Sequence, residues 1–302
     1  MGKIYHRMYN ALGDLMYRRY LHRLMSDEFY IRTRWRKTMG YELDLKKPQL
    51  FNEKLQWLKL YDRNPLYPTL VDKCEVKKWI AEHIGEQYVI PTLAVYNSVD
   101  EIDLDALPNT FVLKCTHDSG SVVLCKDKSS FDLDAAKKKL NARMHYNYYW
   151  NAREWPYKHL KPRIIAEPFL IDDSGENGLL DYKFFCFDGI PQLMYISNDI
   201  SHEAHTSFWN MDFLPLPIRM KDPPPEELPS RPYCFQLMKE LSSKLSQGIP
   251  HIRVDFYLAD NKVYVGELTL YHGGGFTAIS PKEWNRKMGY WIKNDKSFPY
   301  EN

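Results

Sequence analysis

Residues 251–271 read HIRVDFYLADNKVYVGELTLY, and this stretch decides the expected fold. Two runs of alternating apolar and polar residues flank residues 260–262, which predicts two antiparallel strands joined by a three-residue loop. With a loop of that length, Asp255 lies directly opposite Glu267. The even-numbered positions form an almost wholly apolar face, which consists of Ile252, Val254, Phe256, Leu258, Tyr264, Leu268 and Leu270.

The other face of this hairpin brings two carboxylates together. Arg253 lies opposite Thr269 there, next to the Asp255–Glu267 pair. Directly opposed residues have Cβ atoms roughly 5 Å apart, and like charges at that distance destabilise a sheet. A bound divalent cation reverses that effect, and Mg²⁺ accepts carboxylate oxygens alongside substrate phosphates. Two alternatives stay open: the face is solvent-exposed and Arg253 screens the acids, or a two-residue loop shifts the register and separates them.

A small polar turn between two short apolar runs is a second candidate site. Residues 111–124 read FVLKCTHDSGSVVL, with Lys114 at the end of the first run and Ser119, Gly120 and Ser121 at the bend. Backbone N–H groups and hydroxyls at such a bend can bind an anion. The turn is not a Walker A sequence, and no G-x-G-x-x-G occurs in the chain, so an ordinary hairpin loop is the alternative.

The composition is that of a globular protein. Of 302 residues, 44% are hydrophobic and 26% are charged, which excludes wholesale disorder. The net charge of +2 does not suggest a dedicated nucleic-acid binder. No apolar run approaches the roughly 18 residues of a membrane-spanning helix. The five cysteines form no C-x-x-C pair, so we expect neither a zinc site nor a disulfide framework, and a cytoplasmic location.

Residues 1–25 are basic, with apolar residues at helical spacing. Charges interrupt the apolar positions, so the segment does not fit a signal peptide. One interpretation is a basic amphipathic helix on an anionic membrane surface. The alternative is an ordinary helix that packs on the body of the protein.

Hydrophobic periodicity predicts a helical beginning followed by mixed helices and strands. Asn52 is expected to cap the first of four helices, at 52–61, 71–83, 133–144 and 233–245. The expected strands other than the hairpin are 88–90, 111–115, 122–125, 164–170, 182–187 and 193–196.

An ordered series of segments resembles the TupA-type branch of the ATP-grasp superfamily, a branch of polysaccharide and teichuronopeptide biosynthesis proteins. The series spans about residues 47–290, which is most of the chain. Its segments are FNEKLQWLKLYD (51–62), VDKCEVKKWI (71–80), LPNTFVLKCTHDSG (107–120), RIIAEPFL (163–170), DYKFFCFDG (181–189), HIRVDFY (251–257) and VGELTLYHGGGF (265–276).

This resemblance implies an α+β ATP-grasp fold, in which two α+β lobes hold ATP between them. It implies a helical N-terminal region at 1–95, a central lobe with the phosphate loop at 96–170, and a C-terminal lobe with the metal site at 171–302. The implied cofactors are ATP and Mg²⁺, with one or two metal ions.

The resemblance also assigns roles to individual residues. The implied nucleotide-binding residues are Lys73, Lys114, His117, Ser119, Gly120, Ser121, Glu167, Phe169 and Leu170. The implied catalytic residues are Arg253 and Lys183, and the implied metal ligands are Asp255, Glu267 and Thr269. Many ATP-grasp enzymes carry Asn where this chain has Thr269, so the third ligand departs from the family pattern.

The implied activity is an ATP-dependent carboxylate–amine ligase that works through an acyl phosphate and releases ADP and phosphate. Its substrates would be an amine and the carboxylate of a uronic-acid sugar or glycan in capsule or surface-polysaccharide synthesis, with no nucleic-acid partner. The basic N-terminal segment leaves open a peripheral contact with the inner membrane.

The alternative is a glycosyltransferase that uses a nucleotide sugar. Such an enzyme needs an acidic D-x-D metal site, and residues 103–105 and 132–134 have that pattern. Asp132 precedes an expected helix and is typical of a helix cap.

Overall fold

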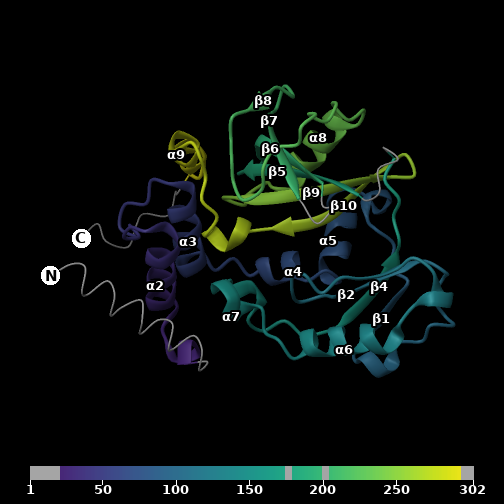
Figure 1. Ribbon diagram of the computed structural model, residues 1–302. Coiled ribbons are helices and arrows are strands. Elements are labelled where there is room, and N and C mark those ends of the chain that lie inside the picture. The colour runs from purple at the N-terminus through teal and green to yellow at the C-terminus, as the bar shows by residue number, and fades with distance from the viewer. Residues whose placement is uncertain (1–20, 174–178, 199–203, 294–302) are drawn as a thin grey trace. The chain divides into compact units, whose positions relative to one another are not determined.

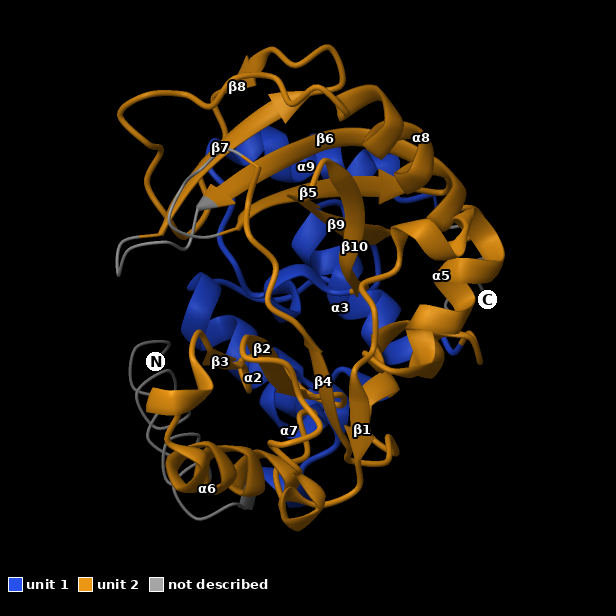
Figure 2. Ribbon diagram, turned by 90° about the vertical axis from the view of Figure 1, so that its right-hand side faces the viewer, with its two compact units in different colours: residues 1–63, 149–155, 271–302 blue, residues 64–148, 156–270 orange. Residues whose placement is uncertain are grey.

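The computed structural model of the chain describes residues 21–173, 179–198 and 204–293 (Figure 1). The chain divides into two compact units (Figure 2). Unit 1 comprises residues 1–63, 149–155 and 271–302, and unit 2 comprises residues 64–148 and 156–270. Most of the predicted basic segment at 1–25 lies outside the described residues. The three-part division expected from the sequence stays a prediction.

Unit 1 is helical. The side-chain hydroxyl of Ser26 accepts a hydrogen bond from the backbone N–H of Phe29 and thereby caps the first long helix. Asn52 does not cap the next helix, because the N-cap is Leu50 and the Asn52 amide instead donates to the carbonyl of Thr277 at 2.7 Å. The elements of unit 1 are η1 (Leu21–Leu24), α2 (Asp27–Met39), α3 (Phe51–Tyr61), α7 (Tyr149–Ala152), η6 (His272–Gly275) and α9 (Lys282–Trp291).

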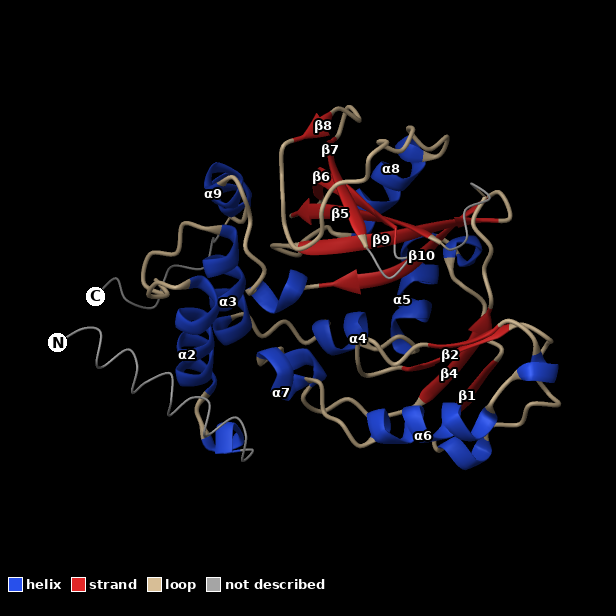
Figure 3. Cartoon of the chain, in the orientation of Figure 1, coloured by secondary structure: helices blue, strands red, loops and turns tan. Residues whose placement is uncertain are grey.

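Unit 2 contains a four-stranded antiparallel sheet in the order β1-β4-β2-β3, whose strands are labelled in Figure 2. Figure 3 shows the strands of unit 2 in red. Its strands are β1 (Ala94–Tyr96), β4 (Ile164–Pro168), β2 (Phe111–Cys115) and β3 (Val123–Cys125). Helix α6 (Leu133–Met144) covers one face, where Leu140 packs with Phe111 and Leu113 in a buried apolar cluster. The opposite face is therefore left to carry the polar residues of β2 and β4.

A six-stranded antiparallel sheet in the order β10-β9-β5-β6-β7-β8 forms the rest of unit 2. Helix α8 (Phe235–Leu245) packs on one face, where the Phe184 ring lies 5.9 Å from Phe235 and 5.7 Å from Phe256 between centroids. Two antiparallel sheets with covering helices confirm the predicted α+β class. The strands are β5 (Leu180–Phe187), β6 (Ile190–Asn198), β7 (His205–Asn210), β8 (Pro215–Leu216), β9 (Ile252–Ala259) and β10 (Lys262–Thr269).

The remaining helical elements of unit 2 are short. They are α4 (Tyr67–Val71), α5 (Glu75–Ile84), η2 (Glu86–Tyr88), η3 (Val99–Glu101) and η4 (Lys128–Ser130), while η5 (Trp155–Tyr157) lies where the chain passes from unit 1 to unit 2. Of the strand predicted at 88–90, Tyr88 belongs to η2 and Val89 forms only an isolated parallel bridge with Val265. No helix of the described ranges has both the length and the apolar composition that crossing a bilayer requires.

The β9–β10 hairpin differs from the prediction in its turn but not in its acidic pair. Ala259 pairs with Lys262, so the loop has two residues, Asp260 and Asn261, both with positive φ. Such a turn alone would separate the two acids. A bulge at Gly266 shifts the register by one residue, so that Glu267 pairs with Asp255 and the predicted pairing is confirmed.

The bulge also changes which residues of β10 share a face. Tyr264 pairs with Tyr257, which lies on the same face of β9 as Asp255. Tyr264 therefore does not project from the apolar face on which the sequence placed it. An ideal Cβ on Gly266 would lie 2.5 Å from the Cε2 atom of Tyr257. Glycine is therefore required here by the close approach of a ring.

We expect Gly266→Ala to lower the free energy of unfolding by about 1–3 kcal/mol, the usual cost of overpacking. Urea denaturation measures this change. In a Tyr257→Ala background, which removes the ring, the same substitution should cost much less. An equal loss in both backgrounds would show that the clash is not the cause.

Candidate nucleotide and metal site

One row of side chains runs across four strands of the six-stranded sheet. Tyr195 on β6 pairs with Lys183 on β5, Lys183 pairs with Asp255 on β9, and Asp255 pairs with Glu267 on β10. Directly paired residues project from the same face of a sheet. The strand register alone therefore places two acids and a lysine next to one another.

Asp255 is the buried centre of this row, with 1% of its surface exposed. Its Oδ1 accepts a hydrogen bond from Arg253 Nε at 2.7 Å, and its Oδ2 accepts from Arg253 Nη2 at 2.6 Å and from Lys183 Nζ at 2.8 Å. Burial acts to raise the pKa of Asp255, but these two cations outweigh it and hold the pKa below its ordinary value. The acidic face is thus not the solvated surface that the sequence left open.

More oxygen atoms surround the pair. Arg253 Nη2 donates to Thr269 Oγ1 at 3.0 Å and lies 3.7 Å from Glu267 Oε2. The Lys183 ammonium also forms an ion pair with Asp181. The other oxygen of Asp181, Oδ1, is buried and has no hydrogen-bond partner in the described part of the chain. Burial raises the pKa of Asp181 to about 6, although Lys183 acts in the opposite direction.

These donors are of the type that Mg²⁺ prefers, namely carboxylate and hydroxyl oxygens. No three His, Cys, Asp or Glu side chains of the described residues converge into a metal-binding group by themselves. Protein-bound Mg²⁺ commonly uses one or two carboxylates and takes its other ligands from water and substrate phosphates. Asp255 and Glu267, with Thr269 beside them, fit a metal that arrives with a nucleotide.

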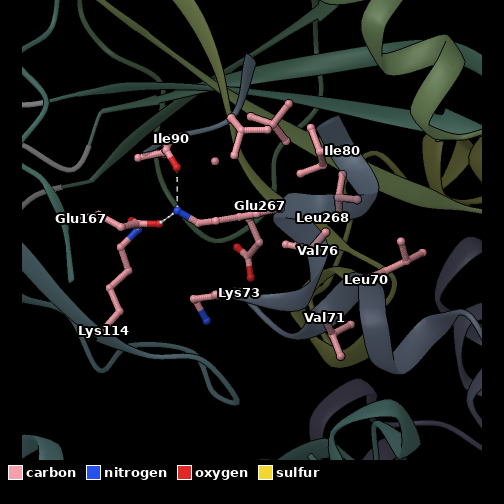
Figure 4. A pocket seen from close by; sticks show the side chains of 14 residues that line it. Leu70, Val71, Lys73, Val76, Ile80, Ile90, Lys114, Glu167, Glu267 and Leu268 are labelled. Carbon is pink, nitrogen blue, oxygen red and sulfur yellow. Dashed lines mark hydrogen bonds and ion pairs between the residues drawn. The ribbon is translucent and has the colours of Figure 1, made fainter. Parts of the chain in front are cut away.

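A second buried carboxylate, Glu167 on β4, is held by two lysines. Lys114 Nζ on β2 lies 2.5 Å from Glu167 Oε2, and Lys77 Nζ on α5 lies 2.6 Å from Oε1 (Figure 4). Lys77 Nζ also donates to the carbonyl of Ile90 at 2.6 Å. Burial acts to raise the pKa of Glu167, but Lys114 and Lys77 together hold it below its ordinary value.

Lys77 is a residue that sequence reasoning missed. Lys73, Val76, Lys77 and Ile80 follow helical spacing, so two lysines interrupt what is otherwise an apolar stripe. That irregularity was the available signal. Lys78, the next residue of α5, projects into solvent, with 85% of its side chain exposed.

A small cavity of about 30 Å³ connects these residues to the hairpin (Figure 4). Apolar side chains form much of the wall, and three lysines and two acids reach it from α5 and the turn before it, β2, β4 and β10. Its lining includes Leu70, Val71, Lys73, Val76, Lys77, Ile80, Ile90, Lys114, Glu167, Glu267 and Leu268. The structure therefore brings four predicted site residues, Lys73, Lys114, Glu167 and Glu267, to one cavity.

The β2–β4 face that carries Lys114 and Glu167 also has an apolar surface. Val112 pairs with Glu167 on β4 and with Leu124 on β3, so all three project from this face. Leu124 is 51% exposed. Val112 lies between Glu167 and Leu124 on this face, so the face combines a carboxylate with an apolar surface.

The predicted phosphate loop is tied to α6 by residues that the sequence did not single out. Arg143 Nε forms an ion pair with Asp118 at 2.5 Å, and Arg143 Nη2 donates to the carbonyl of Ser119 at 2.7 Å. Asp118 Oδ1 accepts from Ser121 Oγ at 2.5 Å, and the Lys73 ammonium donates to the Asp118 carbonyl. Asp118 is fully buried, so its partners fix the base of the loop.

The predicted loop residues differ in exposure. Ser119 and Gly120 are exposed, and Gly120 has φ +89°. Ser121 is buried and accepts from the Cys115 N–H at 2.8 Å, whereas His117 is buried with Nε2 3.2 Å from the Arg143 carbonyl. The exposed bend can meet a ligand, while Ser121 and His117 support it.

Phe169 and Leu170 directly follow β4 and Glu167. Leu170 packs against a buried cluster that contains Ile90, Ala259 and Tyr264. This contact anchors the segment whose backbone is predicted to hold the nucleotide base.

Comparison with known proteins identifies the family of this chain. A model of the TupA-like ATPgrasp family matches residues 53–293, and the chain belongs to this family. The predicted family, and with it the predicted ATP-grasp fold, is thus confirmed. No curated protein matches the sequence.

Similar solved structures include D-alanine–D-alanine ligases. The ligase from Bacillus anthracis, complexed with ATP, is 14% identical with a TM-score of 0.40, and the match covers 67% of this chain and 54% of that one. The Helicobacter pylori ligase is 16% identical with a TM-score of 0.41, over 80% of this chain and 69% of that one. The ATP-grasp ligase PsnB, complexed with a phosphomimetic variant of its minimal precursor, Mg and ADP, is 11% identical with a TM-score of 0.43. This match covers 87% of this chain and 70% of that one. This chain thus spans about half the length of the Bacillus anthracis ligase.

We expect Lys77→Met to lower the free energy of unfolding by roughly 2 kcal/mol at pH 7. That is less than the about 3–5 kcal/mol of a fully broken buried pair, because Lys114 still neutralises Glu167. The difference in unfolding free energy between Lys77→Met and the wild type should shrink as the pH falls through the lowered pKa of Glu167. The reason is that a protonated Glu167 no longer forms an ion pair with either lysine.

The matched control is Lys78→Met, the same change at the next, exposed position, which should stay within about 0.5 kcal/mol of the wild type. Urea denaturation from pH 7 to pH 3 gives both quantities. Equal losses for the two variants would contradict a buried Lys77–Glu167 pair.

Proposed function

We propose that the protein is an ATP-dependent carboxylate–amine ligase. It phosphorylates a substrate carboxylate with the γ-phosphoryl group of ATP, and an amine then displaces phosphate to form an amide. The products are the amide, ADP and phosphate. The observation that carries the proposal is the row Lys183–Asp255–Glu267 in the same unit as the cavity that Glu167 and Glu267 line. Membership of the TupA-like ATP-grasp family supports it.

The nucleotide base would lie on the β2–β4 face. Glu167 would accept the adenine amine there, next to the backbone of Phe169 and Leu170. Lys114 and Lys73 would contact the phosphates, at up to about 4 kcal/mol per contact before desolvation costs. The bend at Ser119 and Gly120 would cover the phosphates and exclude water, which would otherwise hydrolyse the activated carboxylate.

Mg²⁺, when bound, would neutralise charge on the transferring phosphoryl group. Asp255 and Glu267 would hold it, with Thr269 as a further oxygen donor. Arg253 is buried against Asp255, so its guanidinium is fixed in place and would stabilise charge that develops during transfer. Lys183 would reach the phosphates from the same face.

The proposed carboxylate substrate is a uronic-acid sugar or glycan of a bacterial surface polysaccharide, and the second substrate is a small amine. The distribution of charge between the two units supports an anionic substrate. Unit 1 contains 20 Lys and Arg against 11 Asp and Glu, a net +9, whereas unit 2 contains 21 against 28, a net −7. A basic unit attracts a uronate-rich glycan and also an anionic membrane surface, which agrees with a cytoplasmic protein in peripheral contact with the inner membrane.

The triple-glycine turn in η6 of unit 1 is a further candidate for binding a carboxylate group. All three glycines have positive φ. Lys59 Nζ donates to the Gly274 carbonyl at 2.8 Å, and Gln56 Nε2 donates to the Gly275 carbonyl at 2.8 Å. These two side chains from α3 hold the turn in one conformation.

Neither D-x-D triplet supports the glycosyltransferase alternative. Asp132 accepts a hydrogen bond from the Ala135 N–H at 2.8 Å and caps α6, as expected. Asp103 accepts from the Asp105 N–H at 2.9 Å. Both acids thus stabilise local turns of the backbone.

We expect Mg·ATP and Mg·ADP to raise the melting temperature, because a ligand at about 100 times its Kd adds roughly 2.7 kcal/mol of stability. The experiment compares ATP, ADP, UDP and UDP-sugars, each with and without Mg²⁺. Asp255→Asn should lose the magnesium-dependent shift. Asp260→Asn, the same change at the exposed hairpin turn, should keep it.

A shift with UDP compounds alone would overturn the ligase proposal in favour of the transferase. If Mg·ATP binds, uronates and amines can be screened by ADP release. Release that requires both a uronate and an amine would support the proposed substrates, and release with a hydroxyl acceptor alone would indicate a kinase instead.

A further inference from the structure

Lys183 lies between two carboxylates on one face of the sheet. Asp181 is two residues before it on β5 and so projects from the same face, and Asp255 is its partner across β9. The Lys183 ammonium contacts Asp181 Oδ2 and lies 2.8 Å from Asp255 Oδ2. One cation therefore has two acceptors, of which Asp255 is a predicted metal ligand.

Both oxygens of Asp255 already accept hydrogen bonds from cations. Arg253 binds Oδ1 through Nε at 2.7 Å and Oδ2 through Nη2 at 2.6 Å, and Lys183 adds a second contact to Oδ2. A metal ion that binds Oδ2 directly must displace one of these two hydrogen bonds to Oδ2. A carboxylate oxygen has about two acceptor positions, so Arg253 can keep its contacts to both oxygens while the departure of Lys183 frees one position on Oδ2.

An ammonium group withdrawn from a buried carboxylate needs another acceptor, because an unpaired buried charge is strongly unfavourable. Besides the phosphates that Lys183 would reach once a nucleotide is bound, Asp181 is the acceptor that is already in place. It already touches Lys183, only 20% of its side chain is exposed, and its Oδ1 is buried without a hydrogen-bond partner in the described residues. Nothing in the ATP-binding roles assigned so far uses this oxygen.

We propose that Asp181 is a positioning residue that retains Lys183 when a divalent cation takes Oδ2 of Asp255. Lys183 thus occupies the cation's place on Asp255 until the metal and nucleotide arrive, and Asp181 keeps the ammonium on the same face afterwards. This inference rests on the proposed magnesium–nucleotide site.

The test is a titration of Mg²⁺ at a fixed, saturating concentration of ADP, with thermal stabilisation as the readout. Asparagine keeps the shape of Asp181 but not its charge, so in Asp181→Asn the ammonium stays on Asp255 and competes with the cation. We expect the Mg²⁺ concentration at half-maximal stabilisation to rise at least 10-fold. Asp188→Asn, the same change in the exposed turn after β5, is the control and should leave that concentration unchanged.

The double variant separates this role from a merely structural ion pair. In a Lys183→Met background no ammonium competes, so Asp181→Asn should change the Mg²⁺ midpoint less than 2-fold. Lys183→Met alone should bind Mn²⁺ without nucleotide at least 10-fold more tightly than the wild type, measured by the loss of the free-ion electron paramagnetic resonance signal. This measurement keeps the inference testable if Asp181→Asn folds poorly.

Each outcome supports or overturns the inference. Three results would overturn it: an unchanged Mg²⁺ midpoint in Asp181→Asn, an equal effect of this substitution in both backgrounds, or weaker Mn²⁺ binding by Lys183→Met. In each case, stabilisation of the wild type by Mg·ADP would still support the nucleotide site. Absence of any Mg-dependent stabilisation in the wild type would overturn the proposed function together with the inference.

Discussion

The buried carboxylate of Asp255 is the constraint on which the candidate site depends. A charged group is stable in a protein interior only when it is paired, and Asp255 is paired twice, by Arg253 and Lys183. Those partners come from β9 and β5, so the pairing requires the register of both strands. The same register sets Glu267 beside Asp255 on β10. A single strand displaced by one residue would turn its member of the row to the opposite face, against the apolar residues that pack on α8.

Glu167 repeats this arrangement in the four-stranded sheet. It too is a buried acid with two cationic partners, Lys114 from the neighbouring strand and Lys77 from α5. In both places charged side chains are held in position before any ligand binds, within the proposed nucleotide and metal site. Such preorganisation avoids the cost of reorienting the groups during the reaction.

The acidic pair of the hairpin shows how a sequence prediction can be right for an incomplete reason. Strand alternation and a three-residue loop predicted that Asp255 faces Glu267. The loop has two residues, and the one-residue error is cancelled by the bulge at Gly266. Local patterning could not reveal the bulge, because its requirement for glycine comes from the ring of Tyr257 on the other strand.

The sequence by itself determined the α+β class, the family, the acidic pair and the lysine of β2, because these follow from alternation along a strand and from an ordered series of motifs. Only the tertiary structure decided which charges meet. Lys77 reaches Glu167 from a helix, Arg143 reaches Asp118 across 25 residues of chain, and Lys183 lies between Asp181 and Asp255. The physical reason is that ion pairs between separate elements depend on how helices and strands pack, and side-chain periodicity within one element contains no information about its neighbour.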